Sequence, residues 1–233
     1  MKDIIPLKKS IIPACDVPLP VFEKIVEETY GIEGVGAYKV GFQLGLKHGL
    51  PKVVETARRF TDKPIIYDHQ KAATDIPDTG KNFAEVMKTA GVDAVILFPQ
   101  AGPETEKAWI NACRDVGLAV IVGGYMTHEK YVRSDGGYLA DEGVFEMFEN
   151  AAKVGIRDFV VPGNKPDVIA KIKETVEKEG VKPVFYAPGF IAQGGSISDA
   201  AKAAGDRWHA IIGRGIYEAS DFSKAARKYA EKL

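Results

Sequence analysis

The sequence is poor in cysteine and has no long apolar run. Cys15 closes an apolar stretch and Cys113 lies within a helical pattern, and there are no others. Two thiols in such unlike surroundings predict buried free cysteines rather than a disulfide framework, and so a reducing compartment. No apolar run approaches the roughly 18 to 20 residues of a membrane span, and the opening MKDIIPLKK lacks the apolar region of a signal peptide. We therefore expect a soluble, cytoplasmic protein.

An excess of charge of one sign is also missing. Lys and Arg number 31 against 32 Asp and Glu, a formal net charge of −1, and no basic block is dense enough for a nucleic-acid footprint. The four histidines form no paired His or Cys motif with metal-ligand spacing, and no G-x-S-x-G nucleophile motif occurs. The sequence therefore favours a small-molecule partner, without nucleic acid or membrane, and a chemistry that needs neither metal nor cofactor.

What the sequence does contain is an alternation, repeated eight times, of short Val- and Ile-rich runs with longer amphipathic segments. The expected strands are residues 11–15, 36–42, 63–68, 93–98, 118–123, 158–161, 183–187 and 210–213. Runs without polar alternation are typical of parallel strands buried on both faces. Several helical patterns end in glycine just before a strand, which suits left-handed C-caps: Gly91, Gly117, Gly155, Gly180 and Gly205.

Eight such units predict an α/β fold, a TIM (β/α)8 barrel, with residues 1–233 as a single domain. A doubly wound open sheet is the competing fold. It would more often have fewer strands and a glycine-rich first turn, whereas the turn here reads IPACDVPLP.

Charged residues cluster where the second and third strands end. Lys39 stands inside the apolar run AYKVGF, and the stretch IIYDHQKAATDIPDTG brings Asp68, Lys71 and Asp75. A lysine within a strand is costly to bury unpaired, so we expect Lys39 to face carboxylates at the barrel mouth. Alternating acid and base suits a site that directs a lysine proton at a reacting carbon. An ion-pair network that only closes the barrel top is the alternative.

Glycine-rich turns follow the seventh and eighth strands, in VFYAPGFIAQGG and HAIIGRGIY. Barrels commonly bind phosphate at these loops, through backbone N–H groups and a helix N-terminus. Arg214 would grip an anion with two parallel hydrogen bonds. Gln193 would close over it from a loop, although a solvent-exposed glutamine explains that position nearly as well.

Together these residues resemble the orotidine 5'-phosphate decarboxylase family over nearly the whole chain. The motifs that carry the resemblance are CD at Asp16, YKVG at Lys39, DIPDT at 75–79, MTH at 126–128, PGFIAQGG at 188–195 and IIGRGIY at 211–217. The resemblance implies a homodimeric TIM barrel that converts orotidine 5'-monophosphate into uridine 5'-monophosphate and CO2. This is the last step of pyrimidine nucleotide synthesis, and it uses no metal and no cofactor.

The resemblance also implies residue roles. The catalytic set would be Lys39, Asp68, Lys71 and Asp75, the last supplied by the partner subunit. The substrate-binding set would be Asp16, Ile76, Thr79, Thr127, Pro188, Gln193, Gly213 and Arg214. Within it, Asp16 and Thr79 would lie near the ribose and Thr127 near the pyrimidine ring. Gln193, Gly213 and Arg214 would hold the phosphate.

One motif departs from the family pattern, which is Asp-x-Lys-x-x-Asp. Here the spacing is Asp68-x-x-Lys71-x-x-x-Asp75. Residues three apart in a regular strand do not share a face, so Asp68 and Lys71 can meet only if the strand has ended or bulges between them. Counting back from Asp75 would instead put Ala72 and Gln70 at the Lys and Asp positions, which leaves no proton donor.

We favour two local insertions, because all three charged residues are present. Lys71 would then protonate C6 of the pyrimidine. Two alternatives stay open at this point. One is a metal-dependent sugar-phosphate decarboxylase or aldolase of the same barrel superfamily, and the other is a barrel that binds a nucleotide without turning it over.

Overall fold

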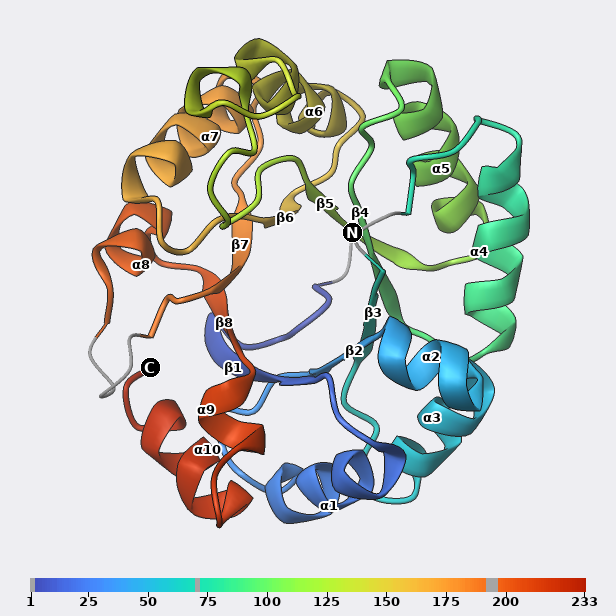
Figure 1. Ribbon diagram of the computed structural model, residues 1–233, viewed down its shortest axis with the longest axis vertical. Helices are drawn as coiled ribbons and strands as arrows, with labels where there is room; N and C mark the ends of the chain where they lie inside the picture. Colours follow the sequence, from blue (N-terminus) through green and yellow to red (C-terminus); the bar gives the residue numbers. More distant parts are fainter. Residues whose placement is uncertain (1–2, 70–71, 192–196) are drawn as a thin grey trace.

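The computed structural model describes residues 3–69, 72–191 and 197–233, and it confirms the predicted (β/α)8 barrel (Figure 1). Eight parallel strands close in chain order, with β8 paired to β1. The strands are β1 Lys9–Cys15, β2 Tyr38–Gly41, β3 Ile65–Asp68, β4 Ala94–Leu97, β5 Ala119–Gly123, β6 Asp158–Val160, β7 Val184–Pro188 and β8 Trp208–Ile212. All eight expected strands are present, and their ends differ from the expected ones by at most two residues.

Helices surround the barrel (Figure 1). They are α1 Leu19–Thr29, α2 Phe42–His48, α3 Leu50–Arg58, α4 Thr79–Thr89, α5 Pro103–Asp115, α6 Asp141–Lys153, α7 Pro166–Lys178, α8 Asp199–Ala204, α9 Arg214–Tyr217 and α10 Phe222–Ala230, with a 3-10 turn η1 at Arg133–Asp135. The five glycines expected as C-caps all have positive φ, between 75° and 91°, which confirms that prediction. Cys15 and Cys113 are buried and free, as expected. Within the described ranges, no helix has the length and apolarity to cross a membrane.

The sequence did not predict α2 and α9. The apolar run AYKVGF was expected to continue as a strand to Phe42, but the strand ends at Gly41 and Phe42 begins α2. Gly49, with φ of 75°, then separates α2 from α3. The helices α1 and α5 each have a proline in the first turn, Pro20 in α1 and Pro103 in α5, where the fixed φ of proline suits the start of a helix.

Strand alternation sorts the core into two layers. In β3, Ile65 and Tyr67 pack outward against the helices, whereas Ile66 belongs to the cluster that fills the barrel interior. Because residues two apart share a face of a strand, Asp68 points to the same side as Ile66. The same alternation in β2 puts Lys39 on the side of Ala37, which is also an interior residue. Both charged residues therefore face into the barrel at its C-terminal rim.

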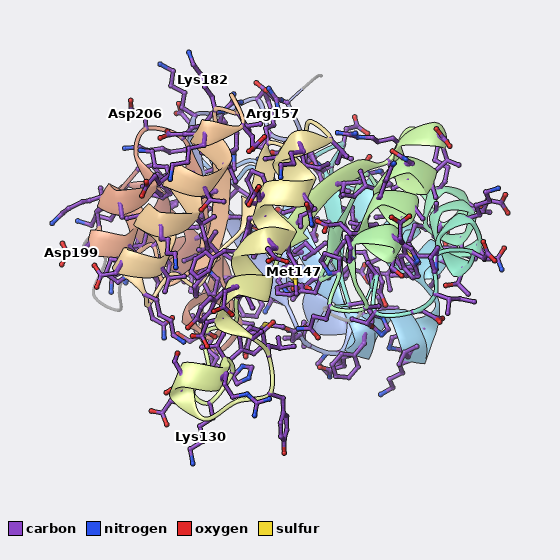
Figure 2. All side chains as sticks on the ribbon, turned by 90° about the horizontal axis from the view of Figure 1, so that it is seen from above. Lys130, Met147, Arg157, Lys182, Asp199 and Asp206 are labelled. Atoms are coloured by element: carbon purple, nitrogen blue, oxygen red, sulfur yellow. The ribbon has the colours of Figure 1, made fainter. Side chains whose placement is uncertain are left out.

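The opposite end of the barrel is closed. Asp3 forms ion pairs with Arg157 and Arg207 beneath the strands, and Ile5 is buried in the interior cluster. Figure 2 shows Arg157 at the end of the molecule opposite to Lys130, which lies in the loop after β5. The polar strand ends gather at the C-terminal rim, which is the end of the barrel where active sites of this fold lie.

A buried carboxyl in α5 should make stability depend on pH. Glu106 is 2% exposed, and its Oε1 has no hydrogen-bond partner among the described residues. Burial raises the pKa of this carboxyl from 4.5 to about 8. A group whose pKa is higher in the folded state contributes stability below its unfolded-state pKa, and this contribution is lost as the pH rises through the folded-state value. Wild-type stability should therefore fall between pH 5 and pH 8 because of Glu106.

Replacing Glu106 by Gln removes that titration. We expect the free energy of unfolding of Glu106→Gln, relative to wild type, to rise by roughly 3 kcal/mol from pH 5 to pH 8. Urea unfolding at the two pH values measures this difference. Glu104→Gln, an exposed carboxyl in the same turn, is the matched control and should run parallel to the wild type. A parallel pH dependence for Glu106→Gln would refute the assignment.

Candidate active site

A buried ion pair forms the floor of the site. Lys39 Nζ donates a hydrogen bond to Asp68 Oδ2 at 2.8 Å, and the two side chains are 11% and 5% exposed. The pairing follows from strand register, because Lys39 lies beside Ile66 and Gly41 beside Asp68. Burial alone would lower the pKa of Lys39, but the Asp68 and Asp16 carboxylates outweigh it and raise that pKa. Lys39 is therefore a fixed ammonium ion, and the expectation that it faces carboxylates is confirmed.

Asp16 follows β1 and lies beside this pair. A Cβ at Gly41 would come within 2.8 Å of Asp16 Oδ1, so the carboxylate extends over the end of β2. Its charge helps to raise the pKa of Lys39. Three charged side chains from the first three strand ends thus converge at one sector of the rim.

A cavity of about 460 Å³ opens over these residues. It is lined by Ala14, Asp16, Lys39, Asp68, Val160, Pro188, Gly189, Ile191, Ile211, Ile212, Gly213, Arg214, Gly215, Tyr217 and Tyr229. The wall combines an acidic and basic cluster, an apolar section and the loop that contains Arg214. The volume is within the range of small-molecule sites, and convergent polar groups in an apolar wall are typical of them.

The Arg214 side of the cavity is built by close backbone approach. Gly213 precedes α9, and Arg214 is its first residue. Gly215 has no room for a side chain, because a Cβ there would lie 2.2 Å from the hydroxyl of Tyr229 in α10. The last helix therefore fixes the loop that presents Arg214.

Pro188 is held by a second close approach. A Cβ at Gly163, in the loop after β6, would lie 1.8 Å from the carbonyl oxygen of Pro188. Only glycine fits at position 163 without moving the end of β7. Gly189, which follows Pro188, has φ of 86° and turns the chain along the cavity edge.

Asp68, the first residue of the third-strand motif, lines the cavity and is the last residue of β3. β3 ends at Asp68, so one condition for Asp68 and Lys71 to meet, a strand that has already ended, is fulfilled. Lys71 itself lies outside the described residues, as does Gln193. Ala72 is buried and its carbonyl accepts a hydrogen bond from the Phe98 N–H at 2.9 Å, just after β4. Ala73 has a left-handed backbone, with φ of 68°, where the chain turns toward Asp75.

Asp75, Ile76 and Thr79 are not among the residues that line this cavity. Their segment is fixed to α5 instead: Thr105 Oγ1 donates to the Asp75 carbonyl at 2.9 Å, and Trp109 Nε1 donates to the Ile76 carbonyl at 3.1 Å. The Ile76 side chain is 59% exposed. The structure thus separates these three predicted site residues from Lys39 and Asp68 of the same chain.

Thr127 lies on the loop after β5, also outside the cavity wall. Its carbonyl accepts a hydrogen bond from Asn164 Nδ2 at 3.1 Å, and its side chain is exposed. Of the predicted residues, the structure brings Asp16, Lys39, Asp68, Pro188, Gly213 and Arg214 together around one cavity.

Two cavity residues had no sequence signal of their own. Tyr229 comes from the last helix, where it reads as part of an amphipathic pattern. Val160 is one of several apolar strand residues, and only its position at the C-terminal end of β6 marks it as a rim residue. Across the ranges that the structure covers, no group of three or more His, Cys, Asp or Glu side chains is arranged to hold a metal ion.

Comparison with known proteins agrees with this geometry. Residues 10–229 match the model of the orotidine 5'-phosphate decarboxylase / HUMPS family. The orotidine 5'-phosphate decarboxylase of Methanosarcina barkeri is 36% identical over 211 residues, which cover 90% of this chain and 87% of the relative. The enzyme of the same name from Methanocaldococcus jannaschii is 31% identical over 211 residues, 90% of this chain and 91% of the relative.

Solved structures agree as well. The crystal structure of orotidine 5'-monophosphate decarboxylase from Methanocaldococcus jannaschii, complexed with the inhibitor BMP, superposes with a TM-score of 0.81 at 27% identity, covering 97% of this chain and 98% of that one. The family model spans almost the entire barrel, from β1 into α10. The chain therefore belongs to the orotidine 5'-phosphate decarboxylase / HUMPS family.

Proposed function

We propose that the chain converts orotidine 5'-monophosphate into uridine 5'-monophosphate and CO2, the last step of pyrimidine nucleotide synthesis, without a metal or a cofactor. The observation that carries the proposal is that the buried Lys39–Asp68 pair, on β2 and β3, lines the same cavity as Gly213 and Arg214, which follow β8. A nucleotide has its reacting ring and its phosphate at opposite ends, and this cavity offers a charged group for each. The proposal also takes residues 1–233 as one domain of a cytoplasmic protein.

The decarboxylation requires stabilisation of negative charge at one carbon. When the bond from C6 to the carboxylate breaks, its electron pair stays on C6, and CO2 leaves. The pyrimidine ring hardly delocalises this pair, so fixed positive charge in a water-poor site is the main means of stabilisation. Lys39 is held by Asp68 in such a place. Lys71 would then give its proton to C6 and recover one from solvent.

Binding of the phosphate contributes at a distance. Arg214 and the backbone of Gly213 would hold the phosphate, with Gln193 closing over it and Pro188 beside it. Binding energy from this remote group can be used to bring loops over the reacting ring and exclude water. Asp16 would contact the ribose hydroxyls.

Loss of orotidine 5'-monophosphate absorbance, followed in EDTA, tests the activity. The proposal predicts rapid loss with uridine 5'-monophosphate as the product. The alternative of a metal-dependent sugar-phosphate decarboxylase or aldolase predicts no such loss, and it predicts an activity on sugar phosphates that the chelator abolishes. Tight binding of uridine 5'-monophosphate without turnover would favour the non-catalytic nucleotide-binding barrel.

We further propose a homodimer in which Asp75, Ile76 and Thr79 enter the partner's site, with Asp75 completing its charged set and Thr79 near the ribose. Asp75 and Ile76 are exposed and do not line the cavity of their own chain. Exposed apolar side chains also lie on α2 and α4: Phe42 is 60%, Leu46 75% and Val86 60% exposed. Figure 1 shows α2, α3 and α4 together on one side of the barrel. Apolar residues gathered on one face are typical of a protein interface.

Subunit complementation tests the shared site. Lys39→Ala and Asp75→Ala homodimers should each be nearly inactive, because every site carries one defect. In a mixed dimer both defects fall in one site and the other site is intact. Co-expression in equal amounts gives mixed dimers in half of the population, so we expect about a quarter of wild-type activity. Activity no greater than the sum of the two homodimers would contradict the exchange of Asp75.

A further inference from the structure

The loop that carries Thr127 is the longest excursion from the rim. It runs from Gly124 to Ala140, between β5 and α6, and Figure 2 shows its Lys130 projecting beyond the body of the barrel. The Thr127 side chain is exposed on it. A protruding loop places such a side chain reproducibly only if its base is fixed.

Tyr131 fixes the base of this loop from the side of β4. Its hydroxyl accepts a hydrogen bond from Gln100 Nε2 at 2.6 Å and donates one to the Gly124 carbonyl at 3.0 Å. Tyr131 is 8% exposed. One buried hydroxyl therefore joins the loop after β4 to the point where the β5 loop begins.

The Tyr131 ring also contacts Tyr125 and His128, the residues on either side of Met126 and Thr127. Its centroid lies 5.6 Å from that of Tyr125 and 5.3 Å from that of His128, the latter edge to face. From the side of β6, Asn164 holds the Thr127 carbonyl and Lys165 Nζ lies 4.6 Å from the centre of the Tyr125 ring. The backbone on each side of Thr127 is thus held, and no hydrogen bond of its hydroxyl is seen among the described residues.

We infer that Tyr131 is a positioning residue, which sets the place of Thr127 over the pyrimidine ring through its hydrogen bonds to Gln100 and Gly124. The inference rests on the proposed function, together with the place near the pyrimidine ring that the family resemblance implies for Thr127. Tyr131 itself acts only through the loop. Removal of its hydroxyl should therefore weaken the binding of ligands that have a pyrimidine ring, and it should not change the binding of ligands that have only the sugar phosphate.

Binding of two ligands to Tyr131→Phe tests this. Uridine 5'-monophosphate carries the ring, and ribose 5-phosphate does not. Loss of one or two buried hydrogen bonds predicts about a five- to tenfold weaker Kd for uridine 5'-monophosphate, with the Kd for ribose 5-phosphate unchanged within about twofold. Tyr138→Phe is the matched control: it removes a hydroxyl from the same loop at a side chain that is 93% exposed, and both Kd values should stay at the wild-type level.

A second variant tests the inference independently, in case Tyr131→Phe does not fold. Gln100 is exposed, so Gln100→Ala should fold, and it should weaken uridine 5'-monophosphate binding in the same direction. The double variant should bind uridine 5'-monophosphate about as weakly as Tyr131→Phe alone, because both substitutions remove the hydrogen bond between Gln100 and Tyr131. Unchanged uridine 5'-monophosphate binding in Tyr131→Phe, or equal weakening of both ligands, would overturn the inference. A wild-type protein that binds neither ligand would overturn both the proposed function and the inference. An active wild-type protein whose variants bind both ligands normally would overturn the inference alone.

Discussion

Replacement of Lys39 by Ala is expected to lower kcat/KM for orotidine 5'-monophosphate by about a thousandfold or more, which corresponds to at least roughly 4 kcal/mol of transition-state stabilisation. Lys39 Nζ lies 2.8 Å from Asp68 Oδ2, and both side chains are almost fully buried. In the proposed mechanism the substitution removes the fixed positive charge beside the carbon where negative charge develops, and it leaves the Asp68 carboxylate buried without that ammonium ion.

The same substitution should also destabilise the fold. Removing one partner of a buried ion pair typically costs about 3 to 5 kcal/mol. Thermal unfolding of Lys39→Ala therefore has to accompany the kinetics, with assays run well below its Tm. Lys52→Ala is a matched control: Lys52 and Glu55 form a pair at 2.9 Å with side chains 58% and 65% exposed, and such pairs contribute little. A folded Lys39→Ala enzyme that retains kcat/KM within about tenfold would refute a catalytic role for Lys39.

Replacement of Arg214 by Ala is the second large effect. We expect kcat/KM to fall by roughly 30- to 1,000-fold, or about 2 to 4 kcal/mol, if Arg214 forms charged hydrogen bonds with the phosphate. Arg214 follows β8, whereas Lys39 and Asp68 stand on β2 and β3, so the proposed mechanism expects the loss to come through binding energy and loop closure rather than through the reacting carbon.

A substrate without a phosphate separates these causes. Orotidine lacks the group that Arg214 would hold, so its slow turnover should be the same in wild type and Arg214→Ala. Arg59→Ala, which removes a surface arginine paired with Glu23, serves as the control and should leave both substrates unaffected. An equal loss for orotidine and its monophosphate would show that Arg214 supports the fold of the site and not the phosphate.

Much of this architecture could be predicted because its causes are local. Uninterrupted Val and Ile runs predicted the eight strands, and glycine before each of several strands predicted left-handed helix ends. Lys39 was conspicuous as a charge within an apolar run, and the structure pairs it with Asp68. The position of Arg214 after the last strand was enough to place it at the rim.

What could not be predicted depends on contacts between distant parts of the chain. Nothing near Asp75 in the sequence indicates that Thr105 and Trp109 of α5 hold its segment, which does not line the cavity of its own chain. The strand run into Phe42 gave no sign of α2, because Phe42 suits a strand as well as a helix. Tyr229 enters the cavity only because Gly215 lets α10 approach.

The third-strand spacing lies between these cases. The sequence alone required the strand to end or to bulge between Asp68 and Lys71, and the structure ends it at Asp68. The left-handed backbone at Ala73 could not be predicted, because the residue there is not a glycine. Whether Lys71 serves as the proton donor is therefore the point on which the proposed mechanism depends most.

The measurement that tests this most directly is the loss of orotidine 5'-monophosphate absorbance in EDTA, with wild type beside Lys71→Ala. The proposed mechanism predicts rapid loss with the wild type and none above background with the variant, both folded by circular dichroism. Turnover by Lys71→Ala at the wild-type rate would remove Lys71 from the mechanism, and a folded wild type without turnover would contradict the decarboxylase itself.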